Sequence, residues 1–142
     1  RPNCDFSFSG LKTAVRNHYD SLVDSDSETK DLADLCASFQ RAISETICDR
    51  SQWAINQYKN FYPEGNTFVL AGGVAANKYL CREITNLANE NDMVVKVPPS
   101  NLCTDNGAMI AWAGIEYLRL GKSSQLDFAP RPRWPLDESI KK

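Results

Sequence analysis

The chain has 142 residues, of which 42% are hydrophobic and 24% charged, and its formal net charge is −2. This composition is typical of a globular domain and excludes a disordered chain. The slight acidity argues against a basic nucleic-acid-binding platform within these residues. No apolar run approaches the roughly 20 residues needed to cross a membrane. The sequence has no signal peptide and opens without an initiator methionine, so we expect part of a longer, cytoplasmic protein.

The cysteines and the single histidine restrict redox and metal chemistry. Five cysteines stand at positions 4, 36, 48, 81 and 103. None are spaced as CxxC, and their odd number favours reduced thiols. His18 is the only histidine, so a zinc site of several His and Cys ligands cannot be drawn. Cys103 has no histidine near it in the sequence, which predicts a buried structural thiol rather than a nucleophile.

The first half of the chain is predicted to be helical. An extended piece at 5–10 precedes a helix over about 11–22, and a polar linker rich in Ser and Asp follows at 20–27. From 29 to 59, apolar residues recur every three or four positions, which predicts a helix with one face on a core. Because this stretch exceeds a typical helix, we expect a break or kink near 50–52.

The second half is predicted to form a parallel βαβ unit. A turn at 63–66 leads into a short β-branched strand at 67–71. A helix over 75–89 and a second strand at 93–97 complete the unit. Two strands alone make a poor sheet, so we expect partner strands outside the chain.

A final helix is predicted over 105–120, with Gly121 as its C-cap. Beyond it, the three prolines of 127–137 exclude a helix and predict an extended segment.

The first segment that could carry chemistry is Leu70-Ala-Gly-Gly-Val-Ala-Ala-Asn77. Gly72 and Gly73 follow a predicted strand and would let the backbone turn tightly and approach a ligand closely. The helix behind them would present N–H groups to a phosphate. Asn77, in the first helical turn, could bind a ribose or base. The alternative is a turn needed only for helix–sheet packing, and the residues alone leave both open.

The second segment is Pro98-Pro-Ser-Asn-Leu-Cys-Thr-Asp-Asn-Gly107. The two prolines force an extended entry, and Thr104 or Asp105 would open the last helix. Asp105 would then be an N-cap. In the alternative, its carboxylate would point into the same crevice as Asn77 and ligate a divalent metal.

A third segment, Phe6-Ser-Phe-Ser-Gly-Leu-Lys-Thr13, combines a SerGly turn with Lys12. The lysine could contact phosphate. A helix start with a solvated lysine is the favoured interpretation.

Three segments together resemble one family. Phe8-Ser-Gly-Leu-Lys-Thr13, Ala71-Gly-Gly-Val-Ala-Ala-Asn77 and Leu102-Cys-Thr-Asp-Asn-Gly-Ala-Met-Ile-Ala111 occur in this order. In this they resemble the TsaD proteins, tRNA threonylcarbamoyladenosine biosynthesis enzymes formerly labelled O-sialoglycoprotein endopeptidases. The resemblance implies an α/β chain that is part of an actin-like ATPase fold of the Hsp70 and sugar-kinase type. Residues 1–126 would form an incomplete, helix-rich C-terminal lobe with a short parallel βαβ unit, and residues 127–142 an extended Pro-rich tail.

The activity implied by the resemblance is transfer of threonylcarbamoyl from threonylcarbamoyl-AMP to N6 of the adenosine beside the anticodon, in tRNAs reading codons that begin with A. Asn77 would contact the adenylate, and Gly72 and Gly73 would let it approach. Asp105 would ligate one divalent metal, iron or zinc, which acts as a Lewis acid and orients the donor. No residue of this chain is assigned as catalytic.

The sequence also departs from the family pattern. The other two metal ligands of the family are histidines in a His-x-x-x-His motif, whereas this chain has only His18. We therefore expect the isolated chain to bind little metal and to lack transferase activity.

Two other functions remain as alternatives. One is a metalloendopeptidase, as the older family label suggests, although the sequence has no His-Glu-x-x-His. The other is a non-catalytic actin-like partner subunit. The resemblance also implies tRNA, a paralogous actin-like subunit and a small P-loop ATPase as partners, and no membrane. An open sheet edge could in addition pair with a second copy.

Overall fold

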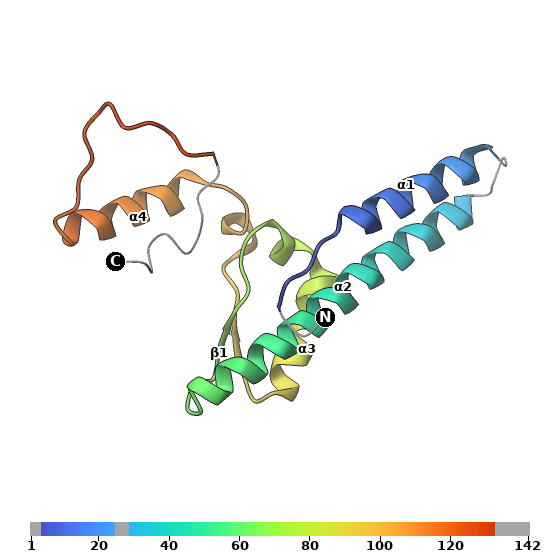
Figure 1. The fold of residues 1–142 in the computed structure, drawn as a ribbon, viewed down its shortest axis with the longest axis horizontal. Coiled ribbons are helices and arrows are strands. Elements are labelled where there is room, and N and C mark those ends of the chain that lie inside the picture. The colour runs from blue at the N-terminus through green and yellow to red at the C-terminus, as the bar shows by residue number, and fades with distance from the viewer. Residues whose placement is uncertain (1–3, 25–28, 133–142) are drawn as a thin grey trace. The chain divides into compact units, whose positions relative to one another are not determined.

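The computed structural model describes residues 4–24 and 29–132 (Figure 1). Contacts divide the chain into two compact units, residues 1–105 and residues 106–142. In chain order the elements are α1 (Ser9–Asp24), α2 (Thr29–Phe61), β1 (Thr67–Val69), the 3₁₀ turn η1 (Gly73–Ala76), α3 (Lys78–Glu90), β2 (Val94–Lys96), the 3₁₀ turn η2 (Ser100–Leu102) and α4 (Gly107–Arg119).

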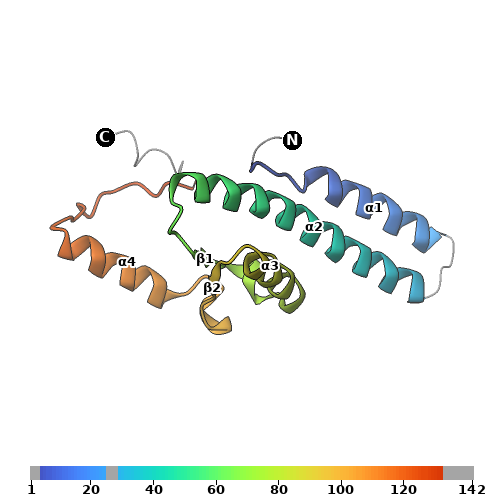
Figure 2. The same ribbon diagram turned by 90° about the horizontal axis from the view of Figure 1, so that it is seen from below.

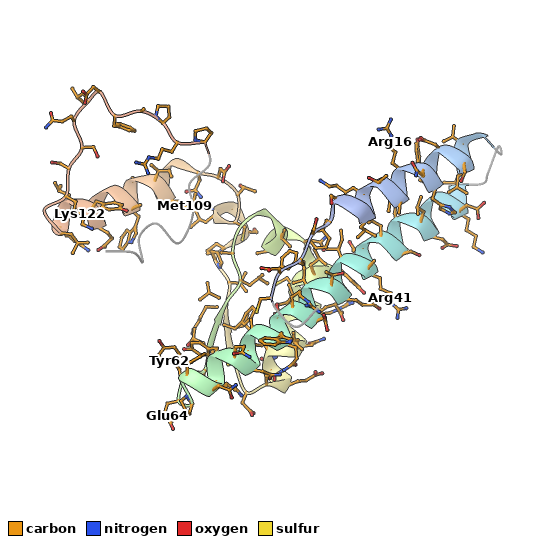
Figure 3. All side chains as sticks on the ribbon, in the orientation of Figure 1. Arg16, Arg41, Tyr62, Glu64, Met109 and Lys122 are labelled. Carbon is orange, nitrogen blue, oxygen red and sulfur yellow. The ribbon has the colours of Figure 1, made fainter. Side chains whose placement is uncertain are left out.

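The long helix α2 packs against α1 on one side and against α3 further along (Figure 2). The predicted break near 50–52 is wrong, because α2 runs through all 33 residues as one helix. The segment contains no Gly or Pro that would interrupt it. Gln52 Nε2 also donates to Asn56 Oδ1 over 3.0 Å. This i,i+4 bond links the last residue of the expected break to the next turn of the helix. Arg16 and Arg41 extend away from the helix pair (Figure 3).

Helix α1 differs from the prediction at both ends. It starts at Ser9 rather than Leu11, and it continues to Asp24. The first part of the predicted linker at 20–27 is therefore helical. Residues 25–28 lie outside the described part of the chain.

The predicted parallel βαβ unit is confirmed. β1 and β2 pair in parallel, with Phe68 opposite Val95. The turn before β1 is closed by a 2.9 Å hydrogen bond from Gly65 N to Tyr62 O. Phe68 and Val95 pack on a buried cluster of Ile55, Ala88 and Met93. Strand side chains alternate between faces, so this inner face of the sheet is covered by α2 and α3.

Helix α3 is amphipathic, and its inner face explains its position. Leu80, Ile84 and Ala88, spaced four residues apart, are all buried. The helix begins at Lys78, not at Ala75 as predicted, because the 3₁₀ turn η1 (Gly73–Ala76) occupies the residues before Asn77.

Helix α4 belongs to the second unit, and none of its residues is buried. Its exposed apolar side chains, with that of its C-cap, are Met109, Ile110, Trp112, Ile115, Tyr117, Leu118 and Leu120. The C-cap is Leu120 rather than the predicted Gly121. Gly121 follows the cap with φ +68°, and Lys122 N donates to Tyr117 O over 2.9 Å, so the glycine ends the helix in a Schellman motif.

Residues 122–132 form neither helix nor strand. The remainder of the predicted extended segment, 133–137, lies outside the described residues. Within the described ranges, no helix combines the length and apolarity needed to span a membrane.

Candidate functional site

The loop after β1 turns at Gly72. This residue has φ 82° and ψ 178°, a region that only glycine adopts readily. A Cβ atom at Gly72 or at Gly73 would meet nothing within 4 Å. Gly72 is therefore required by the backbone itself, whereas Gly73 is not, and both leave one face of the loop open to a ligand.

Asn77 is the N-cap of α3, which corrects its predicted place inside the first helical turn. Its Oδ1 accepts from Tyr79 N at 3.0 Å and from Leu80 N at 3.1 Å, which satisfies two donors that a helix start leaves without partners. Its Nδ2 donates to Gln40 Oε1 at 3.2 Å. The structure thus gives Asn77 a structural role, and its contact with an adenylate stays a prediction.

The two candidate loops leave the same edge of the sheet. Because β1 and β2 are parallel, their carboxyl ends meet at one edge, the usual place for ligands in open α/β sheets. Leu70 N donates to Lys96 O over 3.0 Å at this edge. The first loop then carries Gly72, Gly73 and Asn77, and the second leads to Asp105.

Asp105 is not the cap of the last helix. That role belongs to Asn106, whose Oδ1 accepts from Met109 N at 2.9 Å. Asp105 itself is exposed, and its carboxylate forms no ion pair with any residue in the described ranges. The N-cap interpretation of Asp105 is therefore wrong, and the structure gives its side chain no helix-capping task.

The loop that precedes Asp105 is anchored by Cys103. This thiol is 3% exposed, and its Sγ lies 3.5 Å from Pro98 O and 3.6 Å from Pro99 O, as expected for an S–H donor. The prediction of a buried structural thiol is confirmed. The contact joins the end of η2 to the carbonyl groups of Pro98 and Pro99, and so fixes the path of the chain toward Asp105.

The candidate metal ligands among the described residues do not form a metal site. Among the described residues, no three His, Cys, Asp or Glu side chains come together in a way that could hold a metal ion. Asp105 offers a single carboxylate, which is a suitable but insufficient ligand for iron or zinc. A metal on Asp105 would need ligands from outside the described residues.

The SerGly segment lies elsewhere, against the middle of α2. Ser7, Ser9 and Gly10 line a polar hollow of about 480 Å³ together with Thr46, Asp49 and Arg50. The Arg50 guanidinium pairs with Asp49, with Nε at 2.8 Å from Oδ2. Lys12 instead borders an apolar groove between α1 and α2 and is exposed, as expected for a solvated lysine.

One half-buried thiol on α2, that of Cys48, has an altered acidity. Burial raises the pKa of Cys48 above its usual range, and a hydrogen bond with Ser44 opposes that change. Burial disfavours the thiolate, so Cys48 is a poor nucleophile at neutral pH.

Sequence reasoning missed Gln40 and Gln52, the two residues of α2 that hold the ends of α3. Each pairs with an asparagine far away in the chain: Gln40 with Asn77 and Gln52 with Asn91. The sequence did hold a signal for Gln40. It lies four positions after Cys36 and three before Ile43, which places it on the apolar face of the helix. A polar amide on the apolar face of a helix needs a partner.

Comparison with known proteins gives a consistent result over the whole chain. The family model for "TsaD: tRNA N6-adenosine threonylcarbamoyltransferase" matches residues 1–112. A protein of that name from Rhodospirillum rubrum is 50% identical over 142 residues, which is 100% of this chain and 39% of the relative. The one from Paramagnetospirillum magneticum is 48% identical, over 100% of this chain and 41% of the relative.

A third relative of the same name, from Methylocapsa acidiphila, is 52% identical over 137 residues, 96% of this chain and 38% of its own length. The chain thus spans about two fifths of the length of these relatives. The family match covers well over half of this chain and includes both loops at the sheet edge. The chain belongs to the TsaD family.

Proposed function

We propose that this chain is the C-terminal part of a tRNA N6-adenosine threonylcarbamoyltransferase. In this proposal the loop with Gly72, Gly73 and Asn77 binds the adenylate of threonylcarbamoyl-AMP, and Asp105 provides one ligand to a divalent metal, iron or zinc. The relatives carry the name of that activity. Residues 1–126 would be the C-terminal lobe of an actin-like ATPase fold, and 127–142 its tail.

The proposal rests on two observations, the backbone conformation of Gly72 in the first loop and the exposure of Asp105 in the second. Gly72 adopts a glycine-only backbone conformation with open space around it. Asp105 stands exposed beside the cap rather than in it. Gly72 lets the loop adopt a turn that other residues would not adopt, without filling a packing position, and the carboxylate of Asp105 takes no part in capping α4. An unusual backbone conformation and a side chain without a structural role are expected where a ligand binds.

The reaction would form a bond between N6 of the adenosine and the carbamoyl carbon, while the bond from that carbon to the phosphate oxygen breaks and AMP leaves. In the same reaction N6 loses one of its two protons, so that the atoms on both sides of the reaction balance. Within this chain, the loop residues Gly72, Gly73, Asn77 and Asp105 would bind and orient the donor. Orientation of two reactants is itself a large part of a transfer rate.

The setting of the proposed reaction follows from its substrate. We propose the cytoplasm, where tRNA is available, as its location. The net charge of −2 makes it more reasonable for tRNA to be held jointly with other parts of the longer protein and with partners. A paralogous actin-like subunit and a small P-loop ATPase are the partners we propose.

The test is tRNA modification by the full-length protein carrying Asp105→Ala, with Asn106→Ala as the matched control. Asp105→Ala should abolish modification and lower the bound metal. Asn106→Ala should lose the N-cap of α4, at about 1 kcal/mol of stability, and retain modification. Undiminished activity and metal content in Asp105→Ala would remove Asp105 from the metal site.

A further inference from the structure

Two amide pairs attach the ends of α3 to the same helix, α2. At the C-terminal end, Gln52 Nε2 donates to Asn91 Oδ1 over 2.8 Å, and Asn91 Nδ2 donates to Gln52 Oε1 over 2.8 Å. At the N-terminal end, Asn77 Nδ2 donates to Gln40 Oε1 over 3.2 Å. The two pairs join the same helices, but only the second involves the Gly72 loop.

The hydrogen bonds of Asn77 leave its amide one orientation. Its oxygen has two lone pairs, and the N–H groups of Tyr79 and Leu80 take both. Its nitrogen carries two hydrogens, and Gln40 accepts one of them. A flipped amide would direct NH₂ at two N–H donors, so the cap excludes it. The two cap bonds choose which end of the amide is the oxygen, and the bond to Gln40 holds the nitrogen end, so the three bonds together fix the direction of the second Nδ2 hydrogen.

We propose that Gln40 is a positioning residue, which holds the Asn77 amide so that its second Nδ2 hydrogen is presented to the adenylate of the donor. The inference rests on the proposed function, because it needs the donor to bind at the Gly72–Asn77 loop. Gln40 is itself half-buried and belongs to the uninterrupted part of α2, so its amide is carried on a rigid element. A rigid support of this kind lowers the entropy lost when a ligand is bound.

The experiment is steady-state kinetics of the full-length protein with threonylcarbamoyl-AMP as the varied substrate and tRNA saturating. Gln40→Met keeps the length of the side chain but removes the acceptor. It should raise the KM for the donor by roughly tenfold, the value of one lost hydrogen bond, with kcat little changed. Gln40→Glu keeps an oxygen that accepts from Asn77 and should restore KM to within about twofold of wild type.

Gln52→Met is the matched control, since it breaks the other amide pair between the same two helices. It should lower the melting temperature at least as much as Gln40→Met does, because Gln52 makes more hydrogen bonds, while leaving the donor KM within about twofold. Equal effects of the two variants on the donor KM, or an unchanged KM in Gln40→Met, would overturn the inference.

Asn77→Asp separates failure of the inference from failure of the proposed function. An aspartate still caps α3, and Gln40 can turn its own amide to donate to it, so the N–H offered to the donor is replaced by a carboxylate oxygen, whose negative charge also repels the donor phosphate. A raised donor KM in Asn77→Asp with a normal KM in Gln40→Met would reject the role of Gln40 and keep the donor site. A wild-type protein that does not use the donor, or an Asn77→Asp variant with normal KM, would reject the donor site at this loop and the inference with it.

Discussion

Gln52 and Asn91 exchange two hydrogen bonds of 2.8 Å each, although 39 residues separate them in the sequence. Asn91 is also the C-cap of α3, and its Nδ2 donates to Leu87 O over 2.9 Å. Lys59 Nζ lies 2.5 Å from Asn91 O. One side chain therefore ends α3, ties it to α2 and sets the turn into β2.

Replacing Asn91 should loosen this end of α3. Asn91→Ala leaves the half-buried Gln52 amide without its partner, and we expect a loss of roughly 1–3 kcal/mol. Hydrogen–deuterium exchange of the full-length protein should show faster exchange in 84–91. Asn89→Ala is the control, because Asn89 is an exposed residue of the same helix. Similar exchange in both variants would contradict the assigned role.

The two glycines should differ in their tolerance to alanine. Gly72→Ala would place a Cβ on a backbone with φ 82°, at a cost of about 1–3 kcal/mol. Gly73→Ala meets no atom within 4 Å and needs no positive φ, so its melting temperature should match that of wild type. Because the donor is proposed to approach this loop closely, Gly73→Ala should still weaken donor binding. A fully active Gly73→Ala would show that the ligand keeps its distance.

The sequence predicted the type of nearly every element, because the elements depend on local periodicity. The stripe on α2 and the run Leu80, Ile84, Ala88 are helical patterns, and the glycines and prolines mark real chain reversals. It failed at boundaries and at side-chain pairs. Asn106 was not identified as a cap because Thr104 and Asp105 compete for that role, and Asn77 was not because the predicted helix starts within the 3₁₀ turn before it. The partners of Gln40 and Gln52 come from 37 and 39 residues away, beyond any local pattern.

Cys103 should stabilise the approach to Asp105. Cys103→Ala removes a buried group and the donor to Pro98 O and Pro99 O, and should cost about 1–2 kcal/mol. Exchange in 98–105 should rise. Cys81→Ala, at a half-buried position of α3, should leave 98–105 unchanged. If Cys103→Ala behaves in the same way as Cys81→Ala, the thiol does not anchor this loop.

Cys48 should react slowly with alkylating agents. Since burial raises the pKa of its thiol, its thiolate fraction near pH 8 should be lower in the folded than in the unfolded protein. Mass spectrometry after iodoacetamide treatment at several pH values, with and without denaturant, should place the reactivity of the folded protein at higher pH. The sign for stability follows: this thiol contributes stability below its unfolded pKa, and the contribution is lost as the pH rises through the higher folded value. Equal pH profiles for Cys48 in the folded and unfolded protein would contradict the raised pKa.

The isolated 142-residue chain should bind metal well below one equivalent, because Asp105 is a single ligand and the described residues bring no cluster of three to it. It should also transfer no threonylcarbamoyl group. Elemental analysis of the chain, beside the full-length protein prepared in the same way, tests the first statement. A stoichiometric content would mean that these residues form a metal site of their own.

The amide pairs that hold α3 carry no net charge, unlike the ion pair of Arg16 with Asp20, whose side chains are 82% and 60% exposed. Screening by salt weakens contacts between exposed charges and leaves neutral hydrogen bonds nearly untouched. Asparagine and glutamine also do not titrate. The two amide pairs between α3 and α2 should therefore keep the same strength across wide ranges of ionic strength and pH, including salt concentrations that dissociate a nucleic acid from a protein surface.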